Sequence, residues 1–261
     1  MDVKRIDILF FLPVLLCLTL FGCSENNLFS TWRGREINID GKYTDWNETT
    51  IYYDEKTKVV FNLVNDADYL YVCLISRNRE IETEIMESGF TMWFDPDGGK
   101  KKVFGISFPI GLRRMGMSIE DEKNRDISRD WREQEDRGGL IDRDKERLTD
   151  NNFNKRLETL EGLQSKLEIL IKNNKPLELS LEEAGKLGIE AKVGRENDYF
   201  VYELKVPLVK STEHIYAIEI KEGIPIGLGL EAEGGRPRRR ESMFGSANEL
   251  KLWFTVALFS Y

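Results

Sequence analysis

Two consecutive β-hairpins near the front of the chain constrain its fold more than any other stretch. The apolar runs 58–64 and 69–75 flank a turn rich in Asn and Asp, and the runs 90–95 and 102–109 flank a Pro-Asp-Gly-Gly turn. Asx, Gly and Pro residues between β-branched and aromatic runs indicate turns, because they tolerate or pre-set the backbone angles that turns need. We therefore expect four antiparallel strands here, with the rest of the chain folded against them.

Three later segments are predicted to be strands of the same sheets. Residues 199–207, 226–232 and 250–258 alternate apolar residues with polar or small ones, as strands with one buried face do. In residues 226–232 glycines occupy the second face, which leaves room for another group to approach the backbone closely. A short helix is predicted at residues 79–89, where apolar residues at helical spacing end at Gly89.

The middle of the chain, residues 111–186, is predicted to be a charged and helical insertion. Acidic and basic residues dominate its first part, which cannot bury much surface. Apolar residues at helical spacing predict a helix over residues 153–172, and the capping-box pair Ser180 and Glu183 predicts a second, shorter one. The longer helix could dock on the sheets through its leucines or bind a protein partner.

These elements together indicate a mainly β fold class. We expect an antiparallel β-sandwich, immunoglobulin-like or jelly-roll-like, with this helical insertion. Residues 35–110 and 187–261 are expected to form the sandwich as a single domain with a shared hydrophobic core.

Residues 1–23 have the pattern of a bacterial lipoprotein signal peptide. Two basic residues precede an apolar run that ends in Leu-Phe-Gly-Cys, which resembles the lipobox whose cysteine is lipidated. The run is too short and too broken to span a bilayer comfortably. Cys23 is therefore the predicted lipidation site and residues 24–34 the tether. Ser24 after the cysteine favours the bacterial outer membrane, on its periplasmic or surface side.

Cysteine content and charge exclude several classes of function. Removal of the signal takes away Cys17, and lipidation would use Cys23, so Cys73 is left as a small buried hydrophobe with no partner for a disulfide or a CxxC metal site. The formal net charge is −8, and the sequence has a single histidine. This acidic balance argues against general nucleic-acid binding.

Several motifs occur in an order that resembles a known family. They are the Ile-Asp-Gly of residues 39–41 followed by Asp45-Trp46, the strand from Asp68 to Val72, the Gly-Phe-Thr-Met-Trp-Phe-Asp strand of residues 89–95, and the strand of residues 202–208. In this order they resemble family 9 carbohydrate-binding modules and the wider group of DOMON-type β-sandwiches. The likeness covers residues 35–110 and 187–261 but not the middle of the chain.

The resemblance implies a glycan ligand. Sugar rings present apolar C–H faces that stack on indole and phenol rings, while polar side chains bond the hydroxyl groups. The candidate ligand-binding residues are Trp46, Trp93, Trp131 and Tyr69, each of which could instead pack in the core. The family also implies structural calcium, and the turn that carries Asp95 and Asp97 is the candidate metal site, although Asp favours turns for local reasons as well.

No catalytic constellation stands out in the sequence. The single histidine, His214, has no nucleophile-elbow motif beside it, and paired carboxylates for glycoside hydrolysis cannot be recognised from sequence alone. We therefore predict a membrane-anchored lipoprotein that binds a glycan without catalysis, at most as an accessory to a glycoside hydrolase system in carbohydrate catabolism. The alternative is a structural or assembly lipoprotein that makes protein contacts through helix 153–172.

Overall fold

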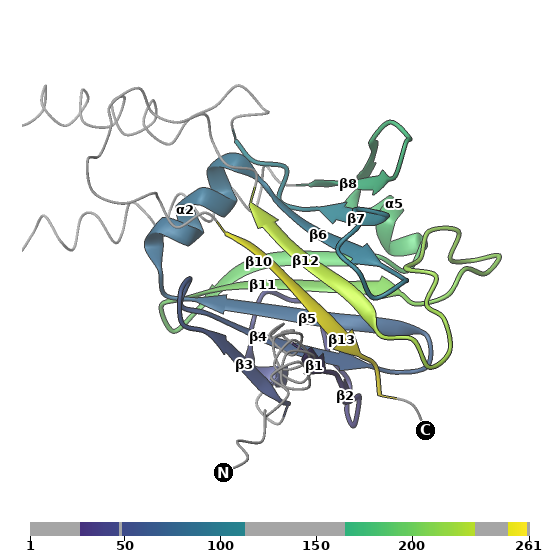
Figure 1. The fold of residues 1–261 in the computed structure, drawn as a ribbon. Coiled ribbons are helices and arrows are strands. Elements are labelled where there is room, and N and C mark those ends of the chain that lie inside the picture. The colour runs from purple at the N-terminus through teal and green to yellow at the C-terminus, as the bar shows by residue number, and fades with distance from the viewer. Residues whose placement is uncertain (1–26, 47–48, 113–164, 233–249, 260–261) are drawn as a thin grey trace, which may run out of the picture.

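The computed structural model describes residues 27–46, 49–112, 165–232 and 250–259, which form two β-sheets packed face to face (Figure 1). This confirms the predicted fold class of a mainly β sandwich. Within these residues no helix is both long and apolar enough to cross a bilayer.

The larger sheet, sheet A, has seven strands in the order β1-β13-β12-β6-β7-β8-β9. In that order the strands span Asn27–Phe29, Lys251–Ala257, Ile226–Ala232, Phe90–Asp95, Phe104–Ser107, Lys166–Ile171 and Leu177–Ser180. Neighbours are antiparallel except β1 and β13, which run parallel. The predicted second hairpin is confirmed as the pair of strands β6 and β7.

The second sheet, sheet B, has the order β10-β11-β5-β4-β2, and β3 also pairs with β4. These strands span Glu190–Glu196, Tyr199–Pro207, Tyr69–Ser76, Val59–Asn65 and Thr31–Trp32, with β3 at Ile51–Asp54. The predicted first hairpin is confirmed as β4 and β5. All pairs are antiparallel except β2 with β4.

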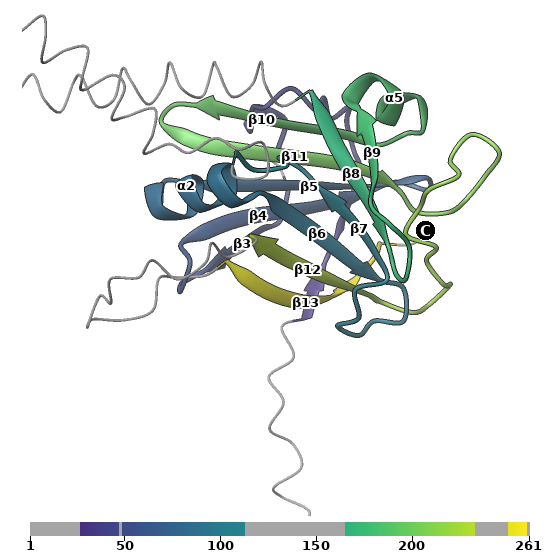
Figure 2. The ribbon, with the colours of Figure 1, turned by 90° about the horizontal axis from the view of Figure 1, so that it is seen from above.

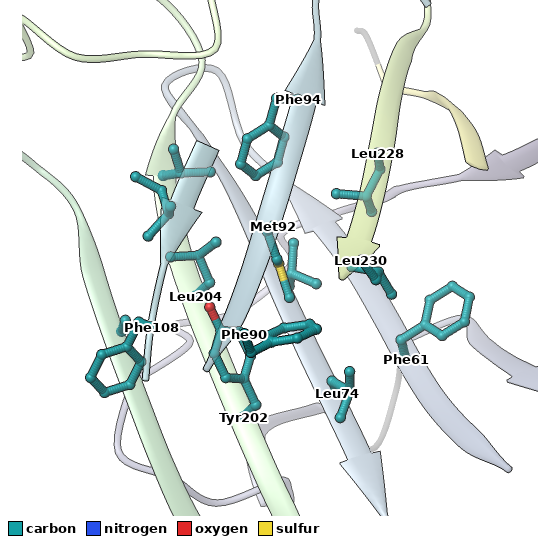
Figure 3. Packing of buried hydrophobic residues seen from close by; sticks show 14 of the residues in the cluster. Phe61, Leu74, Phe90, Met92, Phe94, Phe108, Tyr202, Leu204, Leu228 and Leu230 are labelled. Carbon is teal, nitrogen blue, oxygen red and sulfur yellow. The ribbon is translucent and has the colours of Figure 1, made fainter. Parts of the chain in front are cut away.

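One hydrophobic core lies between the two sheets and joins the front of the chain to its end (Figure 3). Strand β5 pairs with β11 in sheet B, and β6 pairs with β12 in sheet A, so both sheets mix early and late strands. Core side chains from sheet A face those from sheet B; they include Phe90, Met92, Phe94, Leu228 and Leu230 on one side and Phe61, Leu74, Tyr202 and Leu204 on the other. Phe90 meets Tyr202 edge to face, with ring centroids 4.9 Å apart.

Two short helices lie at opposite ends of the strands (Figure 2). Helix α2 (Arg79–Ser88) follows β5, begins at the cap Asn78 and ends at Gly89, whose φ of 91° favours glycine, as the sequence predicts. Helix α5 (Leu181–Lys186) begins with the predicted capping box, in which Ser180 and Glu183 bond each other's backbone N–H groups. A single 3-10 turn, η2 (Thr44–Trp46), precedes β3.

The prediction of a helix over residues 153–172 is wrong from Lys166 onward. Residues 166–171 form β8, which pairs with β7 and β9 inside sheet A. Leu167 and Ile169 point into the core and Glu168 between them points to the other face of the sheet, so the period is that of a strand. The earlier part of that prediction, residues 153–164, lies outside the described residues.

Two predicted boundaries also change. Residues 166–186 contribute β8, β9 and α5 to the sandwich, so the insertion predicted for residues 111–186 does not extend that far. The predicted tether, residues 24–34, contains β1 and β2. The pairing of β1 with β13 places Leu28 in the core, so the sandwich includes part of the predicted tether.

Candidate functional site

A row of aromatic and glycine residues crosses the outer face of sheet A. On β6 the side chains of Phe90, Met92 and Phe94 point into the core, so Trp93 points outward. The strand register places these outward positions side by side across four strands, in the order Trp253 on β13, Gly229 on β12, Trp93 on β6 and Gly105 on β7. We call these four residues the tryptophan row.

The two glycines give the indole rings room to lie against the sheet. A Cβ built on Gly229 would be 2.7 Å from Cε2 and Cζ2 of Trp253, and one built on Gly105 would be 2.7 Å from Cε3 of Trp93. Each indole therefore covers the backbone of a neighbouring strand, which no residue with a side chain would allow. Both tryptophans are half-buried, as expected for rings with one face on the sheet and the other turned away from it.

A polar row runs beside the tryptophan row on the same face. Two residues further along each strand, the register places Lys251, Glu231, Thr91, Ser107 and Glu168 side by side across five strands. Two residues of a strand span about 7 Å, so polar groups lie within a ligand's width of the indoles. The hydroxyl of Thr91 is buried and has no hydrogen-bond partner among the described residues.

Glu231 connects the two rows. Its Oε2 accepts a hydrogen bond from Nε1 of Trp93 at 3.1 Å and also contacts Nζ of Lys102, while Nζ of Lys251 lies 3.4 Å from Oε1. Burial acts to raise the pKa of Glu231, but the two ammonium groups outweigh it and hold the pKa below its ordinary value. The Lys102 ammonium lies 5.1 Å from the ring centroid of Trp93, within cation–π range. The ionised carboxylate thus fixes both the indole and a cation beside it.

The combined face suits a flat ligand with apolar ring faces and polar edges. Half-buried indoles offer stacking area, and the half-exposed ammonium groups of Lys102 and Lys251 offer hydrogen-bond donors beside them. Trp93 belongs to the predicted site, whereas Trp253 was not among the predicted ligand-binding residues. The alternating glycines of residues 226–232, which keep one face of β12 free of side chains so that another group can lie against it, are the sequence signal for this face.

Trp46 does not belong to this face, and its prediction as a ligand-binding residue is wrong. Its side chain is only 2% exposed and packs on the outer side of sheet B with Ile37, Tyr71, Cys73 and Val201. Its Nε1 donates to Oε1 of the buried Glu203 at 2.7 Å, and the backbone N–H of Gly41 donates to Oε2 at 2.5 Å. The indole therefore holds the segment before β3 against sheet B and leaves no ring face for a sugar.

Tyr69, another predicted ligand residue, also lies apart from Trp93. Tyr69 is on sheet B, where its hydroxyl is 2.7 Å from Nε2 of His214 and its ring centroid is 4.4 Å from Nζ of Lys205. Trp131 lies outside the described residues. Of the three predicted ligand residues that the structure describes, Trp93 alone lies in the tryptophan row, so these three do not form one site.

The turn predicted to bind calcium has a donor set that does not fit the metal. Both carboxylate oxygens of Asp95 accept backbone N–H groups, from Asp97 at 3.1 Å and from Lys101 at 2.8 Å. The carboxylate of Asp97 contacts the ammonium groups of Lys221 and Lys101, which lower its pKa. Calcium needs six or more oxygen ligands, and in the described part of the chain no group of three or more acidic, His or Cys side chains is placed to hold a metal.

Comparison with known proteins gives weak matches. No family model matches the chain, and no curated protein matches it. Among solved structures, a family 9 carbohydrate-binding module from Caldicellulosiruptor kristjanssonii in complex with glucose is 13% identical, with 90% of this chain and 97% of that chain covered and a TM-score of 0.36. The same kind of module in complex with cellotriose is 14% identical, with 90% and 95% covered and a TM-score of 0.35. Matches at this level carry no argument about function, so a function for this chain must be argued from its own residues.

Proposed function

We propose that this protein binds a glycan without catalysis on the outer face of sheet A. The observation that supports the proposal is the tryptophan row, in which Trp253 and Trp93 lie across Gly229 and Gly105 on one face of the sheet. Indole faces fixed in this way are platforms for the apolar faces of sugar rings. The rigid sheet beneath them keeps both rings in place before the ligand arrives, which reduces the entropy lost on binding.

The spacing of the two tryptophans favours an oligosaccharide over a single sugar. Trp253 and Trp93 lie on strands separated by one other strand, and two strand spacings amount to about 10 Å. A ligand that stacks on both indoles must be longer than one hexose ring. Hydroxyl groups at its edge can bond the half-exposed ammonium groups of Lys102 and Lys251, which lie beside the tryptophan row.

The proposal includes an anchor in the bacterial outer membrane through lipidated Cys23. Four residue steps separate Cys23 from Asn27, where β1 begins, and a fully extended chain covers at most about 14 Å in four steps. The lipid would therefore hold the sandwich close to the membrane. The anchor and the glycan face together would keep a polysaccharide near the cell envelope.

Titration calorimetry tests the function. The mature chain is titrated with a panel of oligosaccharides of two to six sugars that differ in backbone sugar and linkage. We expect saturable binding that becomes tighter from two sugars to three or four, because a longer ligand reaches both indoles. Absence of binding to every glycan in the panel overturns the proposal.

A further inference from the structure

We infer that the tryptophan row selects anionic glycans, with uronic acid-containing oligosaccharides as the ligand class. The inference depends on the proposed glycan binding and adds the chemistry of the sugar. It begins from the charges around Trp93: the ammonium groups of Lys102 and Lys251 share the single carboxylate of Glu231. One negative charge between two positive ones leaves an excess of one positive charge beside the indole.

The carboxylate of Glu231 has little capacity left for a ligand, whereas the lysines have much. Glu231 already accepts from Trp93, Lys102 and Lys251, and its side chain is only 16% exposed. The side chains of Lys102 and Lys251 are 46% and 54% exposed, and each ammonium has three hydrogens to donate. The charged groups that a ligand can reach beside Glu231 are therefore the ammonium groups of Lys102 and Lys251.

The neighbouring turn adds to the positive charge. The run Asp95 to Lys102 contains three consecutive lysines against two aspartates. Asp95 is buried, with both oxygens held by backbone N–H groups, and Asp97 is paired with Lys221. This local excess of positive charge stands out in a chain whose formal net charge is −8.

The other carboxylates that the described strands place on this face are too distant to cancel the excess. Glu168 lies three strands from Glu231, or about 14 Å, which exceeds the Debye length of about 8 Å at physiological salt. Glu178, one strand further, is paired with Lys166 at 2.6 Å. A carboxylate carried by the ligand would therefore give Lys102 and Lys251 a second negative charge beside the single one of Glu231 that they share.

A neutral sugar and an anionic sugar differ in the partner that they offer the ammonium group of Lys102. Either ligand must move the ammonium from its position 5.1 Å from the Trp93 ring centroid in order to stack on the indole. A uronate sugar offers the displaced ammonium a new carboxylate partner, and a neutral sugar offers only hydroxyl groups. Solvent-exposed ion pairs are individually weak, so we expect a preference of roughly threefold to tenfold for the anionic sugar.

Matched oligosaccharide pairs test the inference. Gluco-, galacto- and manno-oligosaccharides of four sugars are compared with the same oligosaccharides oxidised at C6 to uronates, by calorimetry on the mature chain. We expect the oxidised member of at least one pair to bind more tightly, with a preference that shrinks severalfold in 0.5 M salt. Lys102→Gln and Lys251→Gln should each reduce the preference. Lys166→Gln, which removes the same charge from a half-exposed lysine elsewhere on sheet A, should leave it unchanged.

The outcomes separate this inference from the proposed function. Equal binding of both members of a pair, or tighter binding of the neutral member, overturns the selectivity and leaves glycan binding in place. A preference that Lys166→Gln reduces as much as Lys102→Gln overturns it too, because the effect is then one of net charge. Failure of every pair to bind overturns both the selectivity and the glycan function.

Discussion

The carboxylate of Glu203 accepts the indole N–H of Trp46 at 2.7 Å across 157 residues of sequence. Glu203 lies on β11 in the middle of sheet B and is fully buried, beside Cys73 of β5 in the strand register. The backbone N–H of Gly41 donates to its second oxygen at 2.5 Å. This carboxylate thus fastens the segment before β3, including η2, to the outer side of the sheet.

The first prediction concerns the pH dependence of stability. Burial raises the pKa of Glu203 to about 7, against the opposing effect of the hydrogen bonds from Trp46 and Gly41. Between its ordinary pKa of 4.5 and 7, the folded protein keeps a proton that the unfolded chain has released. The free energy of unfolding should therefore fall as pH rises through this window, by roughly 3 kcal/mol for this group.

Urea unfolding at about pH 5 and about pH 8 measures the effect. Glu203→Gln cannot ionise, so the difference between the two pH values should shrink by most of that amount. Glu178→Gln, which removes a half-exposed carboxylate of β9, serves as the matched control and should keep the wild-type difference. A Glu203→Gln variant with the full wild-type pH dependence contradicts this role for the buried carboxylate.

The second prediction compares two glycines of β12 that differ in what surrounds them. A Cβ at Gly229 would meet the indole of Trp253 at 2.7 Å, whereas one at Gly227 would meet the backbone oxygen of Gly99 at 1.8 Å. The indole can rotate away from the sheet, but the backbone of the Asp95–Lys102 turn cannot. Gly229→Ala should weaken glycan binding by roughly tenfold with a loss of stability of about 1 kcal/mol, and Gly227→Ala should cost roughly 3 kcal/mol or more.

Thermal unfolding and glycan titration of both variants check this contrast. The near-ultraviolet circular dichroism of Gly229→Ala should also change, because the environment of Trp253 changes. Equal stability losses in the two variants, or unchanged glycan affinity in Gly229→Ala, argue against the packing of Trp253 over this glycine.

The third prediction concerns the anchor. Cys23→Ala, expressed in a bacterial host with labelled palmitate, should yield an unlipidated precursor without label, because the thiol that accepts the lipid is absent. Cys73→Ala is the control and should incorporate label as the wild type does, since Cys73 is a buried residue of β5. Label in the Cys23→Ala variant contradicts the lipobox assignment.

The sequence predicted local features of the fold better than the contacts between distant segments. Both hairpins, helix α2 and the capping box at Ser180 follow from turn, cap and alternation patterns, and each is observed. Residues 166–171 fit both the helical and the strand spacing of apolar residues, as short apolar runs often do. Pairing with the edge of β7 selects the strand, and that partner is not visible in the local pattern.

The candidate site was harder to predict for the same reason. Trp46 stands at a predicted turn, but its burial depends on Glu203, far along the chain. Trp253 and Gly229 were both recognisable as members of alternating strands. Their position beside Trp93 depends on the order of β13, β12 and β6 in sheet A, which the sequence does not specify.

The most direct measurement is the affinity of the mature chain for the best-bound oligosaccharide in three variants. Trp93→Ala and Trp253→Ala should each lose roughly fivefold to tenfold in affinity, because each removes one stacking face, while circular dichroism shows that both remain folded. Tyr53→Ala, which removes a 56% exposed aromatic ring from β3 of sheet B, should bind as the wild type does. Wild-type affinity in both folded tryptophan variants, or an equal loss in Tyr53→Ala, contradicts a glycan site on the outer face of sheet A.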